Sequence, residues 1–161
     1  MFGKKLILVG VGASGKDFLR QNFLLNNPTL KFGISCTTRL QRYGENDGVD
    51  YKFLSKEDFQ YKISSGQMLQ YANFGGEYYG TLREDFEKCN LFIMSPDGIK
   101  QLSKEDRLKC NIVGVKSDDD VIYKRLASRG MTNGEINTRR YQDLCLFDDF
   151  DDFDYIIINN Q

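Results

Sequence analysis

The sequence predicts an α/β fold built around a parallel sheet. Four short apolar runs, at residues 6–9, 91–94, 112–115 and 155–158, lack the alternation of polar and apolar residues that a half-exposed strand shows. Such runs are expected of strands covered on both faces. Stretches with helical spacing lie between or beside them, at residues 17–25, 103–108, 117–129 and 135–147. Strands that alternate with helices are typical of a layered fold with helices on both faces of one sheet.

The first strand leads into a glycine-rich loop, residues 10–17, with the sequence GVGASGKD. The pattern GxxxxGK requires two glycines because the backbone must curl tightly enough to aim successive N–H groups at phosphate oxygens. The lysine adds a positive charge, and the next helix turns its N-terminus toward the anion. A glycine-rich turn without a ligand is the structural alternative. We expect the loop to bind the phosphates of ATP through Gly10, Val11, Gly12, Ala13, Ser14, Gly15, Lys16 and Asp17.

Residues 35–81 have a different character from the rest of the chain. Clusters of Thr, Tyr and Phe are interrupted by six glycines. This pattern predicts a strand-rich insertion, with one short helix at residues 56–63 that Ser55 caps.

The second half of the chain returns to helices and buried strands. Ser117 is a candidate N-cap for the helix at 117–129, since three aspartates follow it and would complement the positive end of the helix dipole. Gly130 is expected to end this helix. The acidic stretch at 148–154 is interpreted as a solvated turn before the last strand, in preference to a metal site.

Composition excludes several classes of function. The 22 Lys and Arg against 23 Asp and Glu leave a net charge of −1, which gives no general attraction to nucleic acid or to anionic membranes. The chain has no histidine, so catalytic triads and metal sites that use histidine are excluded. Its four cysteines form no CxxC pair and are expected to be buried, reduced thiols. No apolar run approaches the roughly 20 residues of a membrane span. We expect a cytoplasmic protein (host cytoplasm if it is viral) that acts on small molecules, as a monomer or homodimer.

Four further segments carry a collinear pattern: SCTTRLQRYGENDGVDYKF at 35–53, YANFGGEYYGT at 71–81, KRLASRG at 124–130 and IIIN at 156–159. Together with the glycine-rich loop they strongly resemble the guanylate kinase family over nearly the whole chain. The matching family motifs are STTR with a second arginine, GE and DYxF; WAxxxGxYYGS; KRLxxRG; and IVN. Four motifs in the right order are far more specific than any one of them.

The resemblance implies the three-layer fold of P-loop NTPases. It implies a single domain over residues 1–161, with a core of 1–34, 82–124 and 141–161. It also implies a β-rich insertion that binds the nucleoside monophosphate at 35–81, and a helical lid at about 125–140.

The activity implied is that of a nucleoside monophosphate kinase, which transfers the γ-phosphate of ATP, with Mg²⁺, to GMP or dGMP. Arg39, Arg42, Tyr51 and Tyr79 would hold the acceptor phosphate, while Ser35 and Thr81 would touch its base. The implied catalytic charges are Lys16, Arg39, Arg125, Arg129 and Arg139, and Asn159 would lie near the donor adenine. Phosphoryl transfer suits these residues because it depends mainly on positioning and charge stabilisation.

Two departures from the family concern the acceptor base. Gln70 and Ser95 occupy positions where the family has acidic residues that read guanine. The carbonyl of Gln70 can still accept a hydrogen bond, but its NH₂ group would face a donor unless it turned away. Guanine is therefore the favoured acceptor base, and altered base specificity is the alternative.

Two further departures concern the metal. Asp17 replaces the hydroxyl residue that normally binds Mg²⁺ after the lysine, and Ile93 replaces a strand carboxylate. Our hypothesis is that Asp17 has taken over the anchoring of Mg²⁺, because a carboxylate is a good ligand for that ion. A crippled donor site is the other interpretation of Asp17.

A second class of function remains open at this point. A non-catalytic module of the same fold could use the acceptor site to bind a phosphopeptide. The retained Lys16, loop glycines and lid arginines argue against such a module, since it has little use for donor-site chemistry. A P-loop switch or motor is a third possibility, but it would leave the Arg39, Arg42, Tyr51 and Tyr79 cluster unexplained.

Overall fold

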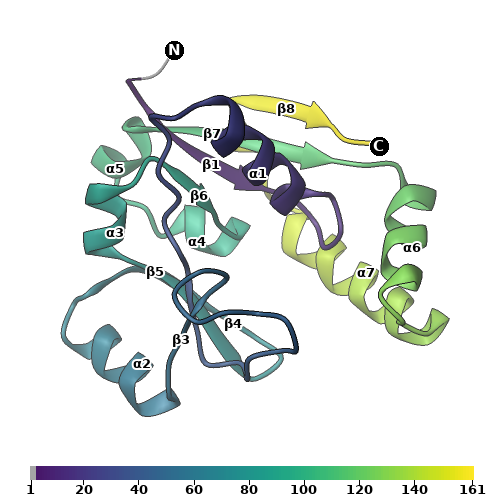
Figure 1. Ribbon diagram of the computed structural model, residues 1–161, viewed down its shortest axis with the longest axis horizontal. Helices are drawn as coiled ribbons and strands as arrows, with labels where there is room; N and C mark the ends of the chain where they lie inside the picture. The colour runs from purple at the N-terminus through teal and green to yellow at the C-terminus, as the bar shows by residue number, and fades with distance from the viewer. Residues whose placement is uncertain (1–2) are drawn as a thin grey trace.

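The central sheet has four parallel strands in the order β6-β1-β7-β8 (Figure 1). A computed structural model describes residues 3–161 of the chain. The strands are β1 (Lys5–Val9), β6 (Leu91–Ile93), β7 (Cys110–Lys116) and β8 (Tyr155–Ile158). All three pairings are parallel, with Leu6 opposite Leu91 and Lys5 opposite Cys110. The predicted parallel sheet is therefore confirmed.

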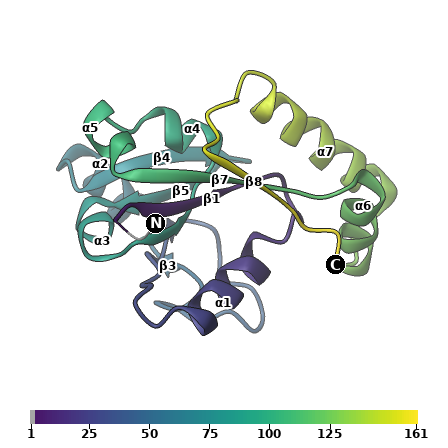
Figure 2. The ribbon, with the colours of Figure 1, turned by 90° about the horizontal axis from the view of Figure 1, so that it is seen from above.

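Alternate residues of the central strands face two separate cores. Leu8 and Val113 pack with Leu19 and Phe23 of α1 (Lys16–Asn26) on one face. Ile7, Val9 and their neighbours pack on the other face with residues of α3, α4 and the turn after α7. Figure 2 shows α1 on one side of the sheet and α4, α5 and α7 on the other. The apolar runs within these strands show no alternation with polar residues, because both faces of the sheet are covered.

Five helices complete the core and its extension. They are α3 (Arg83–Lys88), α4 (Pro96–Lys100), α5 (Lys104–Leu108), α6 (Asp119–Ser128) and α7 (Asn133–Phe147). A capping box starts α7, in which Thr132 and Glu135 bond to each other's backbone. Helix α7 is continuous, so the expected boundary between lid and core at residue 140 falls within it.

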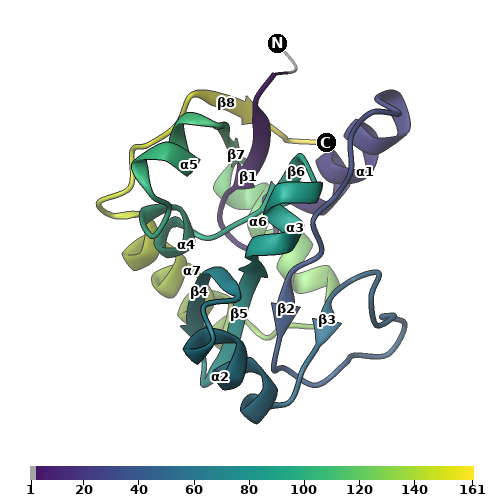
Figure 3. The same ribbon diagram turned by 90° about the vertical axis from the view of Figure 1, so that its left-hand side faces the viewer.

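The insertion forms a second sheet in the order β3-β2-β5-β4. Its elements are β2 (Cys36–Thr37), β3 (Lys52–Phe53), α2 (Lys56–Ser64), β4 (Met68–Phe74) and β5 (Glu77–Leu82). Ser55 caps α2 by accepting a hydrogen bond from the N–H of Asp58, as predicted. Figure 3 shows this sheet and α2 below the central sheet, and Figure 1 shows the insertion and the α6–α7 pair as two separate projections.

Helices α3 and α4 were not predicted, and four further details differ from the prediction. Helix α6 begins at Asp119 with Asp118 as its cap, because the Ser117 hydroxyl instead donates to the carbonyl of Ser14. Strand β8 forms an edge of the sheet, and three of its four residues are exposed, although it was expected to be covered on both faces. Cys145 is exposed on α7 while Cys36 and Cys110 are buried, and burial raises the pKa of both buried thiols to about 11. The 148–154 turn buries Phe150 in the core.

No helix within residues 3–161 is long and apolar enough to cross a membrane.

Candidate active site

The glycine-rich loop between β1 and α1 forms a nest of backbone N–H groups. Ala13 and Gly15 have φ angles of 61° and 91°, in the left-handed region. Residues that alternate in handedness turn successive N–H groups toward one point, which is the geometry of a phosphate site. Gly10 is required for a different reason, since a Cβ there would lie 2.3 Å from the carbonyl oxygen of Val115.

Lys16 spans this loop from the first turn of α1. Its ammonium donates to the carbonyls of Gly10 at 2.7 Å and Val11 at 2.9 Å. Burial lowers the pKa of Lys16 to about 8, although Asp17 and Asp143 act in the opposite direction. At neutral pH the side chain therefore remains mostly charged, as a phosphate ligand must be.

The carbonyl side of the loop is held by Arg125 and Asn159. The Arg125 guanidinium donates to the carbonyls of Ala13 at 2.9 Å and Asn159 at 3.0 Å. The Asn159 amide is buried and donates to the carbonyl of Ser14 at 3.1 Å. In this structure both residues bind the loop through its backbone carbonyls. Their predicted contacts with the transferred phosphate and with adenine remain predictions.

Helix α7 brings Arg139 and Asp143 to the opposite side of the loop. The N–H of Gly12 donates to Asp143 Oδ2 at 2.9 Å, and Arg139 Nε lies 3.5 Å from Asp143 Oδ1. Arg129 at the end of α6 is exposed, and its charge is one of those that lower the pKa of Lys16. Two of the three predicted lid arginines thus have their charges near Lys16. The role of Asp143 was missed, because nothing in the linear sequence of α7 indicates a contact with residue 12.

An arginine–tyrosine cluster, formed by Arg39, Tyr51 and Tyr79, lies in the insertion. The Arg39 guanidinium stands 5.3 Å from the centre of the Tyr51 ring, and the Tyr51 and Tyr79 rings meet edge to face at 6.1 Å. The Arg39 guanidinium donates two hydrogen bonds, of 2.8 and 3.0 Å, to the Glu45 carboxylate. These bonds raise the pKa of Arg39 above its ordinary value. Arg42 belongs to the same turn but has an exposed side chain, while its N–H donates to Glu45.

The predicted base contacts lie at the junction of β4, β5 and α4. Gln70 and Thr81 are cross-strand partners, and the Gln70 amide donates to the Thr81 hydroxyl at 2.9 Å. Gln70 is 5% exposed, and its carbonyl oxygen lies against Gly98 of α4. Ser95 caps α4 by accepting from the N–H of Gly98, whereas Ser35 is half-buried just before β2. A register shift between Met68 and Gln70 accompanies the burial of both Leu69 and Gln70.

Asp17 lies in the first turn of α1, directly after Lys16. Its side chain is 77% exposed, and its only ion pair among the described residues is a long one of 3.8 Å to Arg20. Burial is the main cause that raises the pKa of Tyr51, and the negative charge of Asp17 is the second. No group of three or more candidate metal ligands occurs within residues 3–161. Mg²⁺ needs only one or two carboxylates when substrate phosphates supply the other ligands. A free carboxylate at this place fits that requirement.

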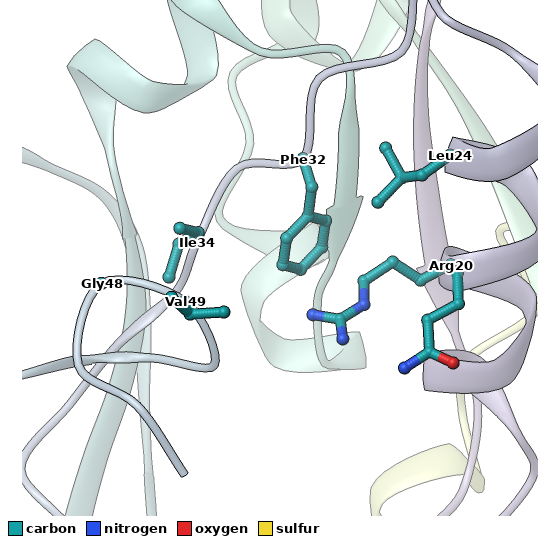
Figure 4. A pocket seen from close by; sticks show the side chains of 7 residues that line it. Arg20, Leu24, Phe32, Ile34, Gly48 and Val49 are labelled. Atoms are coloured by element: carbon teal, nitrogen blue, oxygen red, sulfur yellow. The ribbon is translucent and has the colours of Figure 1, made fainter.

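A groove separates α1 from the loop that precedes β3 (Figure 4). It has a volume of about 310 Å³ and is lined by Arg20, Gln21, Leu24, Phe32, Ile34, Gly48 and Val49. The Arg20 guanidinium lies 4.7 Å from the centre of the Phe32 ring, and Arg20 Nε is buried without a hydrogen-bond partner. Through Arg20 the groove lies next to Asp17, but it contains none of the predicted nucleotide-binding residues.

Nearly the whole chain matches a family model. Residues 2–161 match the model described as "Guanylate kinase". The chain belongs to the guanylate kinase family.

Relatives of this family member confirm the assignment. The guanylate kinase of Symbiobacterium thermophilum is 30% identical over 165 residues, which cover 98% of this chain and 78% of the relative. The guanylate kinase of Helicobacter pylori strain 26695 is 33% identical over 165 residues, covering 96% and 78%. The crystal structure of guanylate kinase from Anaplasma phagocytophilum superposes with a TM-score of 0.71 at 22% identity, over 99% of this chain and 78% of that one. The predicted family, fold and enzyme class are confirmed.

Proposed function

We propose that this chain transfers the γ-phosphate of ATP to GMP or dGMP, giving ADP and GDP or dGDP. The observation that carries the proposal is the arrangement of two anion sites around Asp17. The nest with Lys16 suits a nucleoside triphosphate, and the arginine–tyrosine cluster suits a monophosphate. As a kinase of small nucleotides, the protein would act in the cytoplasm, as a monomer or homodimer.

The reaction exchanges one P–O bond for another. The bond from the γ-phosphorus to the β,γ-bridging oxygen breaks, and a bond to an oxygen of the acceptor phosphate forms. A phosphate monoester has a second pKa of about 6, so the attacking oxygen is already ionised at neutral pH and needs no general base. The absence of histidine is therefore compatible with this chemistry.

The residues would act by position and charge. Lys16 and the nest would hold the β- and γ-phosphates, while Arg39 would hold the acceptor phosphate once that phosphate displaces or joins Glu45. Arg139 and Arg129 would face the transferred group. Mg²⁺, held by Asp17 and the phosphates, would neutralise charge on the triphosphate.

The polarity of the Gln70–Thr81 pair supports a 6-oxopurine acceptor. The Thr81 hydroxyl accepts from Gln70, so its own proton is free to donate to the 6-oxo group of the base. The Gln70 carbonyl oxygen can then accept from the purine N1–H. Adenine has a 6-amino donor in place of the 6-oxo acceptor and an N1 acceptor in place of the N1–H donor, so AMP fits poorly.

The same pair favours a second acceptor, IMP. Recognition of the guanine 2-amino group needs a further acceptor, and an amide has one oxygen where a carboxylate has two. IMP lacks that amino group. We therefore expect the rates with IMP and GMP to be more similar in this enzyme than in one with a carboxylate at residue 70.

The test is ADP release from ATP in the presence of GMP, dGMP, IMP, AMP or a pyrimidine monophosphate. We expect turnover with GMP and dGMP, weaker turnover with IMP, and little with the others. Lys16→Met is the matched control and should abolish turnover of every acceptor. Absence of turnover with all acceptors, together with absence of ATP binding, would favour the phosphopeptide module.

A further inference from the structure

One contact joins helix α7 to the donor loop. Asp143 is buried, with 12% of its side chain exposed, and its carboxylate accepts a hydrogen bond from the N–H of Gly12 at 2.9 Å. Its other oxygen lies 3.5 Å from Nε of Arg139, one helical turn earlier. A buried carboxylate is costly unless it is paired and hydrogen-bonded, and Asp143 has one partner of each kind.

The position of Gly12 shows how closely the Arg139 fork approaches the loop. A Cβ on Gly12 would lie 3.1 Å from both Nε and Nη2 of Arg139, and 3.2 Å from Asp143 Oδ2. The guanidinium therefore lies against the loop backbone, in close contact with the position that a Cβ on Gly12 would take. Arg139 is 52% exposed, so without Asp143 nothing shown among the described residues would fix its fork.

The contact with Asp143 leaves the terminal Nη groups of the Arg139 guanidinium without a partner among the described residues. Nε is the Arg139 nitrogen within ion-pair distance of Asp143, and within residues 3–161 neither Nη group makes a hydrogen bond, so both can still donate to a phosphate oxygen. Both charges also act on Lys16, since Asp143 raises and Arg139 lowers its pKa. Asp143, Arg139 and Lys16 thus form one electrostatic group around the glycine-rich loop.

We propose that Asp143 is a positioning residue that fixes the Arg139 fork over Gly12, where it meets the transferred phosphate. This inference rests on the proposed phosphoryl transfer. An arginine that is held before the reaction needs no reorganisation during it, and misplacement of such a group costs about 10²-fold in rate. Asp143 acts through Arg139 and touches no reacting atom.

The first experiment is a double-mutant cycle on turnover. Asp143→Asn keeps a carbonyl oxygen for Gly12 but loses the charge that holds Arg139. We expect kcat to fall by about 10- to 10²-fold, with KM for ATP and GMP changed less than about threefold. In the background of Arg139→Ala, the same substitution should change kcat by less than about threefold. An equal loss in both backgrounds would overturn the proposal. So would a loss that extra Mg²⁺ restores, because it would make Asp143 a metal ligand.

The control is Asp119→Asn, which removes the partner of Arg140, the neighbour of Arg139 on α7, from an ion pair of 2.5 Å. It should leave kcat unchanged. If Asp119→Asn lowers kcat as much as Asp143→Asn does, the effect belongs to helix stability and the proposal fails.

A second readout does not depend on activity. The amide proton of Gly12 in the wild-type protein should resonate downfield, as expected of a hydrogen bond to a carboxylate, and should move upfield in Asp143→Ala. If the wild-type enzyme transfers no phosphate while this signal moves, the proposed function fails and the contact stands. If turnover is normal but the Gly12 signal is unchanged in Asp143→Ala, the positioning role is wrong.

Discussion

In the proposed function, Gln70 serves two hydrogen-bonding partners, Thr81 and the acceptor base, with one amide. Its NH₂ group is committed to Thr81 inside the sheet, which leaves a single carbonyl oxygen for a base. Glu45 offers a comparison, since a carboxylate there binds two nitrogens of Arg39 at once. The difference of one oxygen atom decides how many donors a residue can satisfy.

The substitution Gln70→Glu should therefore raise the preference for GMP over IMP. A second oxygen can accept from the 2-amino group, and one charge-assisted hydrogen bond is worth about 10- to 10²-fold in relative kcat/KM. The measurement is the ratio of kcat/KM for GMP and IMP. Gln67→Glu is the control, because Gln67 is exposed at the start of the same hairpin. An unchanged ratio would show that residue 70 does not read the base.

Replacement of Asp17 by serine tests the metal hypothesis. If Asp17 anchors Mg²⁺, Asp17→Ser should raise the Mg²⁺ concentration for half-maximal activity by about tenfold or more, as expected when a metal site loses a carboxylate. Asp120→Asn, which removes an exposed carboxylate paired with Lys124, should have no effect. Tighter use of Mg²⁺ and higher activity in Asp17→Ser would contradict the hypothesis.

At the scale of elements, the short helices depend on side chains at their ends. Helix α5 has five residues. Asp106 takes part both in the N-cap of this helix and in its contact with Arg83 of α3. The N–H of Asp106 donates to Ser103 Oγ, and the Asp106 carboxylate accepts from Arg83 at 2.8 Å and Ser103 at 2.9 Å. Burial alone would raise the pKa of Asp106, but the hydrogen bonds from Arg83 and Ser103 outweigh it and lower the pKa below its ordinary value.

This shift makes α5 sensitive to acid. A carboxyl group whose pKa is lowered by folding stabilises the protein above its unfolded pKa of about 3.9, and this contribution is lost as the pH falls through the lower folded value. Asp106→Asn should lower the free energy of unfolding by about 1–2 kcal/mol at pH 7. The difference from wild type should shrink below about pH 4, as urea unfolding can measure. Glu105→Gln, which removes an exposed pair with Lys109, should change stability by less than about 0.5 kcal/mol.

The elements that could be predicted from sequence are those whose pattern is local. The run at residues 6–9 is apolar throughout because Leu8 faces α1 while Ile7 faces the opposite core. Helix α4 was not predicted, since Pro96 and Gly98 have low helix propensity and the helix depends on the Ser95 cap. The contact of Gly12 with Asp143 joins residues 131 positions apart, and no local pattern encodes it.

At the scale of the whole molecule, the groove beside α1 leaves the insertion room to approach the core. We expect acceptor binding to narrow it, since the arginine–tyrosine cluster must come within reach of the donor phosphates. The protein has no tryptophan, so Val49→Trp would place a single fluorophore at the exposed edge of the groove. Addition of GMP and a non-hydrolysable ATP analogue should shift its emission to shorter wavelength. Tyr61→Trp, on the exposed surface of α2, should not respond, and an unchanged emission from the Val49→Trp variant would show that the groove stays open.

If the groove narrows on acceptor binding, discrimination between acceptors affects kcat as well as KM. When part of the binding free energy of the acceptor is used to bring two parts of the chain together, a shortened acceptor loses turnover as well as affinity. Ribose 5-phosphate has the phosphate that we propose Arg39 holds, but it has no base to contact Gln70. It should therefore be a poor substrate even at saturation, and selectivity among acceptors would be visible in kcat as well as in KM.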